Sequence, residues 1–480
     1  MSAARYEVDR EATTERPRAL DTRQDLAFSW AVTLLGLLAR LFVAIAWSKE
    51  PVWDGHYYHY GAERIAAGLG YSEDALSHGV PIWKPWTHYP VGYSGLLALF
   101  YRLFGSGLLV APLVNAVAGA VLVLLVHRLA RYCLTENRAR IAAAIAALHP
   151  GLIIYSALVM TEIVAADLLL AALLVALRFR GSFRGPVLAG LLLGLGALVR
   201  PVSLLALPLL FVLDGGPWRL ALLRTASAVG VALLVIAPWT IRNCARMDGC
   251  ALISTNGGWN LAIGAIGESG RFETLRASDG CPVVTGQVQQ DRCWAMVGWQ
   301  RIKSNPAKWL LLAPKKLEQT YNHESFAIEY LREADPVTWN EQRRVAGREL
   351  LTFFHRLLLV ASALGAVNLL GHFKPPPIDG LLQLALLLAV ALYSAYAAAH
   401  DAHPFYVLPA LVPLLALLPL PGRPQQSRAL YVLWLLVALT SLTHIVFFGE
   451  DRYHLVITPV LCILAAAALR HGRSEPAVAL

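Results

Sequence analysis

Apolar runs long enough to cross a bilayer recur along the chain between residues 28 and 470. A helix needs roughly 20 consecutive apolar residues to span the hydrocarbon core, and polar or charged residues separate these runs. The first run, from Ala27 to Trp47, is too long and too far from Met1 for the apolar part of a cleaved signal peptide. The pattern therefore predicts an all-α, polytopic membrane protein whose first helix is a signal anchor.

The later runs predict eleven further helices, so we expect about 12–13 in total. The stretch 90–106 is apolar enough to span, but counting it would place the basic residues of 128–140 outside the cell. We interpret it as a helix at the outer surface. The later helices are expected at 107–128, 141–158, 163–179, 186–199, 201–213, 220–238, 350–371, 380–399, 405–419, 429–447 and 455–470.

The distribution of basic residues sets the predicted topology. Arginine or lysine is found in every segment between helices that this count assigns to the inside, as the positive-inside rule expects. Both termini are then cytoplasmic. The outer side receives 48–106, the corner at Thr161 and Glu162, the segment 240–349, the turn 400–403 and the turn 450–452.

Composition agrees with this assignment. Of 480 residues, 57% are hydrophobic and only 15% are charged, which excludes an ordinary soluble enzyme. The net charge of +9 would suggest a nucleic-acid partner in a soluble protein, but here basic residues flank membrane helices and record topology. We predict a lipid bilayer as partner and no nucleic acid; the oligomeric state stays unknown.

Three regions follow from the helix pattern. We expect an N-terminal transmembrane module at 1–239, which includes a first outer loop at 48–106 with juxtamembrane helices. A long outer segment follows at 240–349, and C-terminal transmembrane helices occupy 350–480.

Four of the six cysteines lie in the long outer segment. In an oxidising compartment such as a periplasm they suit disulfides, and proximity favours Cys244 with Cys250 and Cys281 with Cys293. Spacing alone allows three connectivities, and four free thiols are an equal alternative.

Most residues that could take part in catalysis or binding lie on the predicted outer face. Each one alone is most simply a solvated anchor at a membrane boundary, but together they form a set with acids and fixed cations at helix mouths. The acids are Asp54 and Glu162, and the other members are Tyr58, Lys84, His88, Tyr89, Arg200, Arg242, Asn243, Arg452, Tyr453 and His454.

Acids and arginines in one site suit the transfer of a group away from a phosphate. A carboxylate accepts the proton of an acceptor hydroxyl, while arginines stabilise the charge that develops on the leaving phosphate. Aromatic residues crowd the same loop, but an aromatic belt at the membrane interface explains most of them without a ligand.

The motifs in this set resemble a known family, the C-type membrane glycosyltransferases, and more narrowly the bacterial branch of the protein O-mannosyltransferase and aminoarabinose transferase family. The resemblance spans nearly the whole chain. It is carried by Asp54-x-x-x-Tyr58, Gly68-Leu69-Gly70-Tyr71, His88-Tyr89-Pro90-x-Gly92-Tyr93, Thr161-Glu162, Arg200-Pro201, Pro238-Trp239-Thr240-Ile241-Arg242-Asn243 and Arg452-Tyr453-His454.

The resemblance implies an inverting transferase that moves a sugar from a polyprenyl-phosphate donor to an acceptor on the outer face of the inner (plasma) membrane. It assigns Asp54 and Glu162 to the catalytic centre, and Arg242 and Arg452 to the lipid phosphate. Many relatives have Asp-Glu where this chain has Asp54-Gly55, so a two-carboxylate mechanism in the first loop is unsupported. The lysine with which aminoarabinose transferases bind phosphate falls on Tyr89, and Lys84 or His454 would have to assist.

We predict no required cofactor. A divalent metal is the lesser alternative, for which the sequence offers His56 with His59, or the group His400, Asp401 and His403.

Two rival functions remain open. A lipid or glycan transporter would also be polytopic, but it should show ionisable residues near helix midpoints and repeat symmetry; we note Asp167 near a span and find no convincing repeat. An outer-face polymerase or ligase would use a diphosphate-linked donor. The acceptor is equally open: lipid A or other lipopolysaccharide, a polysaccharide, a glycolipid or protein hydroxyls.

Overall fold

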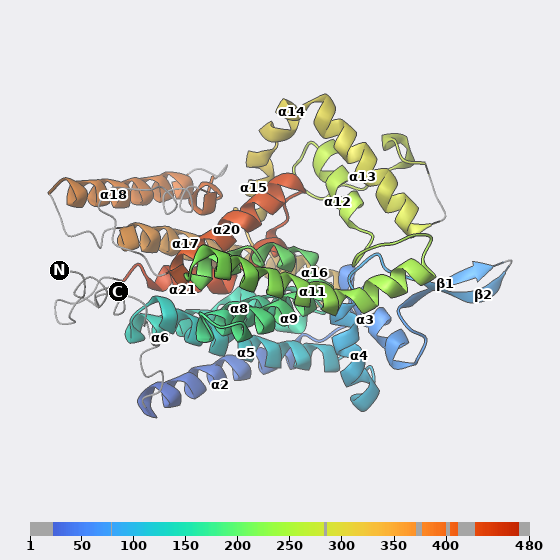
Figure 1. Cartoon of the computed structure of the whole chain (residues 1–480), viewed down its shortest axis with the longest axis horizontal. Helices are drawn as coiled ribbons and strands as arrows, with labels where there is room; N and C mark the ends of the chain where they lie inside the picture. Colours follow the sequence, from blue (N-terminus) through green and yellow to red (C-terminus); the bar gives the residue numbers. More distant parts are fainter. Residues whose placement is uncertain are drawn as a thin grey trace.

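The computed structural model describes residues 23–77, 79–282, 286–370, 377–399, 404–410 and 428–469. Helices dominate these residues, as predicted, and the apolar helices run side by side along the long axis of the molecule (Figure 1). They are α2 (Arg23–Ala46), α5 (Val110–Cys133), α6 (Glu136–Leu148), α8 (Glu162–Arg178), α9 (Arg184–Val199), α10 (Leu209–Asp214), α11 (Trp218–Arg246), α17 (Glu341–Leu370), α18 (Pro377–Ala399), α20 (Arg428–Val446) and α21 (Thr458–Ala466).

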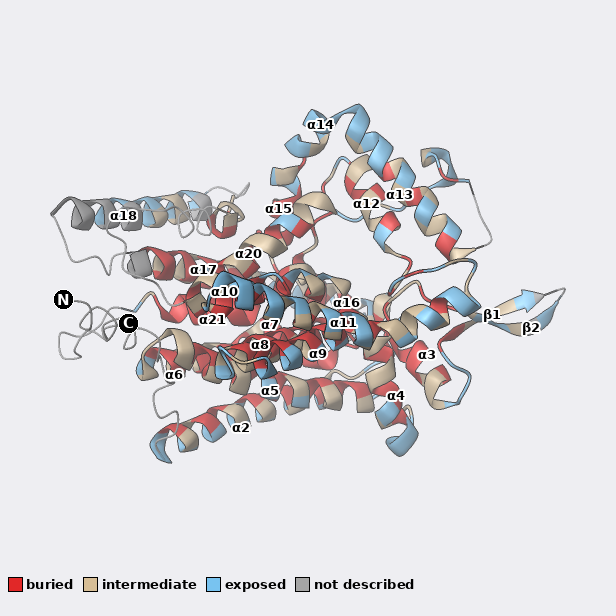
Figure 2. Ribbon diagram, in the orientation of Figure 1, coloured by how far each residue is buried: buried red, intermediate tan, exposed pale blue. Residues whose placement is uncertain are grey.

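Five described helices, α2, α5, α11, α17 and α20, are long and apolar enough to cross a membrane, and a bent pair would make six. Their outward faces carry large apolar side chains, such as Leu38 and Phe42 on α2, whereas buried residues face the centre of the bundle (Figure 2). A surface of this kind is stable only in lipid. The chain is a multi-pass membrane protein, and the total of about 12–13 spans stays a prediction.

The runs at 163–179 and 186–199 form α8 (17 residues) and α9 (16 residues) close to the predicted bounds. The run at 201–213 instead begins as a 3-10 helix (Pro201–Ala206) before α10. Most of the expected helix at 405–419 lies outside the described residues.

The run at 141–158 is a broken helix rather than a straight one. Pro150 cannot donate a backbone hydrogen bond, so α6 ends at Leu148 and the chain resumes, bent by 53°, as α7 (Pro150–Ile154) and a 3-10 turn (Tyr155–Ala157). Arg40, fully buried on α2, donates to the carbonyls of Ala146 and Ala147 at 3.0 and 3.1 Å. A guanidinium thus satisfies the last carbonyls of α6, which the break leaves open.

One end of the bundle carries the first outer loop and is called here the hairpin end. It contains α3 (Asp54–Ala66), the antiparallel strands β1 (Ser72–Ser77) and β2 (Val80–Pro85), and α4 (Gly92–Phe104), which is the helix expected at 90–106. The two strands, which the all-α prediction omitted, project from the body as a hairpin (Figure 1).

The long segment between α11 and α17 forms a lobe beside the bundle (yellow-green to yellow in Figure 1). Since α11 continues to Arg246 and α17 begins at Glu341, the lobe is shorter at both ends than the predicted 240–349. Disulfides join Cys244 to Cys250 and Cys281 to Cys293, which confirms the pairing that proximity favoured. The helices are α12 (Gly257–Ile266), α13 (Gln287–Ser304), α14 (Pro306–Leu311), α15 (Ala313–Tyr321) and α16 (Phe326–Ala334), with a 3-10 turn at Ala277–Asp279.

Candidate active site

Asp54 is the first residue of α3 and follows a strained backbone position. Trp53 has φ of 50°, the one positive φ outside glycine among the described residues. Such a conformation costs on the order of 1–3 kcal/mol for a bulky residue and persists only where the surroundings enforce it. Here α16 does so, because the Trp53 ring contacts Phe326 and Tyr330, and the Tyr330 hydroxyl accepts a hydrogen bond from the Val52 N–H.

Gly55 completes this corner. A Cβ atom at position 55 would lie 2.2 Å from the Tyr330 hydroxyl oxygen and 3.0 Å from the Val159 carbonyl oxygen. A glutamate at this position, as in many members of the resembled family, therefore has no room. The structure gives a physical reason for the departure at Asp54-Gly55.

Asp54 forms a short ion pair with Arg452, which lies in the 3-10 helix Asp451–Val456 between α20 and α21. Arg452 Nη1 is 2.5 Å from Asp54 Oδ2, and Arg452 Nε contacts Glu450 Oε2 at 2.5 Å. Tyr89 donates to the other Asp54 oxygen at 2.7 Å. The guanidinium therefore joins two carboxylates, and both oxygens of Asp54 have defined partners.

The charges in this group shift each other's pKa values. Burial by itself would raise the pKa of Asp54, but Arg452 and the Tyr89 hydroxyl stabilise the carboxylate more, so the pKa lies below its ordinary value. For Glu450 burial prevails and the pKa is raised in spite of Arg452. Asp54 is therefore the more acidic of the two carboxylates.

A second acid–arginine pair lies beside the first. Glu162, fully buried at the start of α8, accepts from Arg200 Nη1 at 2.7 Å, and Thr161 accepts from the same nitrogen at 3.1 Å. The Tyr453 ring lies between the pairs, 5.5 Å from the Arg200 guanidinium and 5.3 Å from that of Arg452. Glu162 Oε2 is buried and has no hydrogen-bond partner among the described residues.

Aromatic rings surround Asp54 on its α3 side. Tyr58 packs against Tyr89 at 5.4 Å between centroids, and His88 packs edge-on against Tyr89 at 4.9 Å. Burial lowers the pKa of His88, so its imidazole is neutral and can orient a ligand without adding charge. The predicted set Tyr58, His88 and Tyr89 is thus brought together with Asp54.

An apolar pocket meets the second pair. Six polar residues contribute to its lining, namely Arg200, Ser203, Thr440, Thr443, His444 and Tyr453. The apolar lining is Leu169, Val202, Leu205, Ala206, Leu436, Leu439, Val456 and Ile457. An arginine in a mainly apolar pocket suits a lipid with a charged head.

Arg242 and Asn243 have structural partners instead. Arg242 donates to the carbonyl oxygens of Trp86, at 3.1 Å, and of Tyr71, and it packs over the Trp239 ring. Asn243 is fully buried and donates to the Ala251 carbonyl oxygen. Both residues hold the first outer loop and the disulfide-closed turn against the end of α11, so the structure does not bring them to Asp54.

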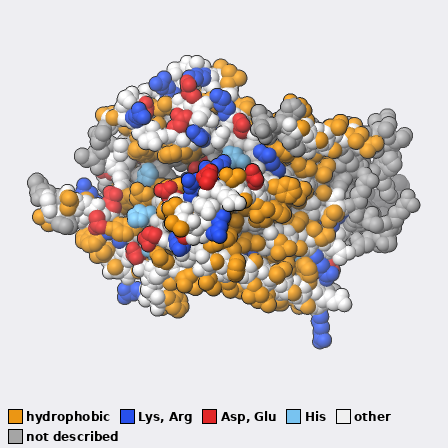
Figure 3. Space-filling model, turned by 180° about the vertical axis from the view of Figure 1, so that it is seen from behind, with side chains coloured by type: hydrophobic (Ala, Val, Ile, Leu, Met, Phe, Trp, Pro, Cys, Tyr) orange, Lys and Arg blue, Asp and Glu red, His pale blue; other side chains and the backbone are white. Residues whose placement is uncertain are grey.

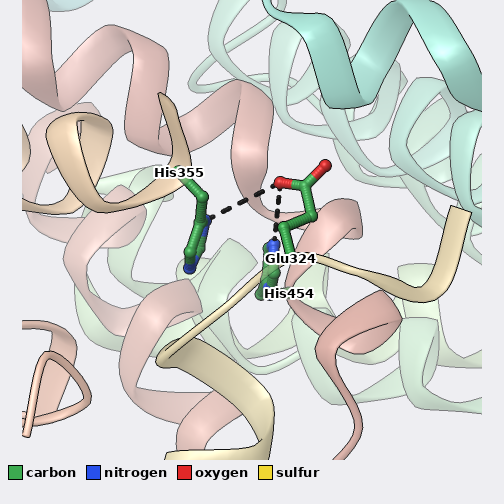
Figure 4. A group of neighbouring side chains, drawn as sticks. All are labelled: Glu324, His355 and His454. Carbon is green, nitrogen blue, oxygen red and sulfur yellow. Dashed lines mark hydrogen bonds and ion pairs between the residues drawn. The ribbon is translucent and has the colours of Figure 1, made fainter. Parts of the chain in front are cut away.

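Lys84 and His454 also lie apart from the acid–arginine pairs. Lys84 is on β2, opposite Glu73 in the projecting hairpin. His454 is fully buried; it approaches Glu324 and stacks on His355 (Figure 4). The predicted assistance of either residue to the leaving phosphate has no geometric support.

The first group named for a metal, His56 with His59, has other partners in the structure. His59 Nδ1 bonds the Tyr101 hydroxyl, and His56 stacks on Tyr60. His400, Asp401 and His403 lie outside the described residues.

Sequence reasoning missed Tyr330, Glu450 and Phe326, which hold Asp54 and Arg452. Glu450 precedes Arg452 by two positions, and the charge pattern alone could have indicated it. Phe326 lies 4.7 Å from the Arg452 guanidinium. Its backbone N–H donates to Asp451 at 2.8 Å, so Asp451 caps α16 rather than facing solvent.

Charged and histidine side chains gather between the lobe and the bundle, and a broad hydrophobic surface covers much of the rest of that face (Figure 3). With this geometry established, the chain can be compared with known proteins. Residues 88–241, about a third of the chain, match a family model described as dolichyl-phosphate-mannose-protein mannosyltransferase. The matched segment includes Glu162 and Arg200, and the match confirms the resemblance in this part of the sequence. A search of curated protein sequences returns no match.

Solved structures similar to the chain are polytopic C-type glycosyltransferases. An Archaeoglobus fulgidus oligosaccharyltransferase tethered to an acceptor peptide is 16% identical over 94% of this chain and 49% of its own, with a TM-score of 0.45. The same archaeal enzyme in complex with an inhibitory peptide and a dolichol-phosphate is 15% identical over 92% of this chain and 50% of its own, with a TM-score of 0.44. ArnT from Cupriavidus metallidurans bound to undecaprenyl phosphate is 14% identical over 92% of this chain and 77% of its own, with a TM-score of 0.35. The chain spans about half the length of the archaeal enzyme.

Proposed function

We propose that the protein is an inverting glycosyltransferase of the inner membrane, which transfers a sugar from a polyprenyl-monophosphate donor to a cell-envelope acceptor on the outer face. The observation that carries the proposal is the pair of acid–arginine contacts, Asp54–Arg452 and Glu162–Arg200, next to an apolar pocket that contains Arg200. The family match over 88–241 and the lipid phosphates in the similar structures support the same class.

The two arginines suit the donor phosphate. Arg452 and Arg200 side chains are 13% and 19% exposed, so each is dehydrated enough for strong charge-assisted hydrogen bonds and still reachable. The polyprenyl chain would occupy the apolar pocket, with its phosphate at Arg200 and Arg452 around Tyr453.

Asp54 is the proposed base. When the donor phosphate draws Arg452 away, Asp54 loses the partner that depresses its pKa, so its affinity for a proton rises at the moment of reaction. The acceptor hydroxyl then attacks the anomeric carbon, its proton passes to Asp54, and the bond between that carbon and the phosphate oxygen breaks. The leaving polyprenyl phosphate keeps the bonding electrons, and the arginines stabilise its added charge.

The remaining residues position this machinery. Tyr89 orients the Asp54 carboxylate, Glu162 holds Arg200, and Tyr58 and His88 line the sugar side. The lobe, which faces the same end of the bundle, would contribute to the acceptor side.

Mass spectrometry of envelope lipids and glycans tests the function. We compare cells that contain the wild-type protein, Asp54→Asn, or no protein, with Asp214→Asn as the matched control, because Asp214 pairs with Arg224 at 3.0 Å away from the proposed site. The wild type and the control should add a fixed mass to one acceptor class, and Asp54→Asn should not.

The donor is tested separately, by binding to purified protein. Undecaprenyl phosphate should bind more tightly than undecaprenyl diphosphate, and Arg200→Ala should weaken that binding. A preference for the diphosphate would favour a polymerase or ligase, and envelope composition that is the same with wild type and Asp54→Asn would refute the proposal.

A further inference from the structure

Three polar side chains from separate segments meet in the interior (Figure 4). Glu324 lies between α15 and α16, His355 is on α17, and His454 is in the 3-10 helix that also carries Arg452. Glu324 is 2% exposed and both histidines are fully buried. The transfer proposed above gives this cluster no role.

The hydrogen bonds of the two histidines fix which ring nitrogens face Glu324. His454 Nδ1 lies 2.6 Å from the Thr320 carbonyl oxygen, and His355 Nε2 lies 2.8 Å from the Tyr321 carbonyl oxygen. A carbonyl can only accept, so these two nitrogens carry the hydrogens. In the neutral rings, His454 Nε2 and His355 Nδ1 therefore present lone pairs.

Both of these nitrogens lie near the same carboxylate oxygen. His454 Nε2 is 3.4 Å and His355 Nδ1 is 3.9 Å from Glu324 Oε2, and the two rings stack with centroids 3.9 Å apart. Three acceptors thus face one another out of reach of water. Such an arrangement is repulsive unless a cation lies among them.

The spacing fits a metal ion. The three ligand atoms lie within 4.8 Å of one another. Zinc with bonds of about 2.0–2.1 Å in tetrahedral geometry separates neighbouring ligand atoms by roughly 3.3 Å, so a small inward movement closes the site.

Gly151 provides the room for the carboxylate. A Cβ at that position would lie 1.8 Å from Glu324 Oε1, which is itself buried without a hydrogen-bond partner among the described residues. The free second oxygen lets Glu324 bind a metal through either atom.

We propose that Glu324, His355 and His454 bind a divalent transition metal, zinc by the chemistry of the ligand set. Two imidazoles and one carboxylate are a recurrent zinc combination, and the carbonyls of Thr320 and Tyr321 are the outer partners that orient the imidazoles. Three protein ligands leave a coordination position for water.

The metal would hold segments of the chain together and would take no part in the transfer step. It joins α17 and the loop before α16 to the 3-10 helix of Arg452, two residues before His454. Loss of the metal should therefore loosen Arg452 and lower the stability of the protein. This site is independent of the identity of the sugar or acceptor.

Metal content of the full-length protein in detergent tests the proposal, after removal of any histidine tag. Wild type equilibrated with zinc and desalted should retain about one equivalent by inductively coupled plasma mass spectrometry. Glu324→Gln, His355→Gln and His454→Gln should each weaken zinc binding by more than the roughly 10–100-fold expected for loss of an outer partner. His127→Gln, a buried histidine beside Ser29 and Asp25, is the control and should retain the metal.

Two further measurements on the wild type do not depend on whether variants fold. Cobalt should give the visible absorption of a tetrahedral nitrogen–oxygen site, and chelation should lower the melting temperature until zinc is restored. Wild type that binds neither metal at micromolar concentrations would overturn the proposal. Undiminished binding by the three cluster variants would also overturn it.

Discussion

Two clusters of buried acid and arginine lie at opposite ends of the same bundle. At the hairpin end Asp54 pairs with Arg452 at 2.5 Å, and its side chain is 19% exposed. At the other end Asp25 lies among His127, Arg131 and Arg140 at 3.5–3.6 Å and is 1% exposed. Both clusters bury a carboxylate with arginines, so burial of charge does not distinguish a site from a structural element.

The two clusters differ in access to a ligand and in backbone strain. Asp54 follows the strained Trp53 and belongs to a group of charges and rings next to an apolar pocket, whereas Asp25 is closed in by α2, α5 and α6. Asp25 also lies in the first turn of α2, where a carboxylate favours the helix dipole. A buried ion pair therefore indicates a catalytic or binding site only where a ligand can also reach it.

The largest effect should separate the two acids. Asp54→Asn removes the proposed base and should lower transfer by roughly 10²–10⁴-fold with little change in melting temperature. Asp25→Asn removes the buried anion and leaves Arg131 and Arg140 to pair with Glu136, which should cost up to about 3 kcal/mol of stability while the folded fraction keeps its turnover. Thermal melts and single-turnover rates on both variants decide this; similar losses of rate would remove the distinction between the clusters.

The second-largest effect should separate the arginines of the two clusters. Arg452→Lys replaces a fork that reaches Asp54 and Glu450 with a point charge, and we expect transfer to fall by about 10–100-fold. Arg131→Lys, where the contact to Asp25 is 3.6 Å, should change transfer by less than about twofold. Binding of undecaprenyl phosphate to each variant shows whether the loss lies in the donor complex.

A smaller effect tests the strained corner. Gly55→Ala forces a methyl group against the Tyr330 hydroxyl and should cost about 1–3 kcal/mol, with a reduced rate because Asp54 moves. Adding Tyr330→Phe to the Gly55→Ala variant removes that oxygen and should restore part of the lost stability and part of the lost rate. If the double variant is no better than Gly55→Ala, the contact is not what requires glycine.

The smallest effect concerns pH. Asp54 has a folded pKa below its ordinary value, so activity should be constant at neutral pH and fall only as acid protonates the carboxylate. Tyr89→Phe removes a hydrogen bond to the ionised form, so it should raise this pKa and move the acid limb of the pH–rate profile upward, with less than about a tenfold loss at neutral pH. An unshifted limb would show that Tyr89 does not act on Asp54.

The sequence predicted much of the fold and half of the site for one physical reason. Helix ends and membrane sidedness follow from local composition, so Asp54, Glu162, Arg200 and Arg452 could be placed on one face before their contacts were known. The disulfides followed because each pair is close in the chain.

The rest depends on packing that local patterns do not encode. Arg242 has the same composition signal as Arg452, but only the fold shows that backbone carbonyls use its hydrogens. Asp54 and Arg452 are 398 positions apart, and Glu324 and His355 are single polar residues whose meeting with His454 has no spacing signature. The break at Pro150 was missed, because 141–158 was predicted as one helix, and nothing in the sequence pointed to Arg40 as the residue that satisfies it.

Arg40 has a consequence for biosynthesis. Its acceptors outside α2, Ala146 and Ala147, are made 106 and 107 residues later, which at ribosomal speeds of about 5–20 residues per second is a delay of about 5–20 s. An arginine at a helix centre costs about 2.5–3.5 kcal/mol during membrane insertion. We expect α2 to remain beside the translocation machinery until α6 emerges, and photo-crosslinking of stalled nascent chains through position 40 would detect this wait; early release into lipid would show that the arginine is tolerated alone.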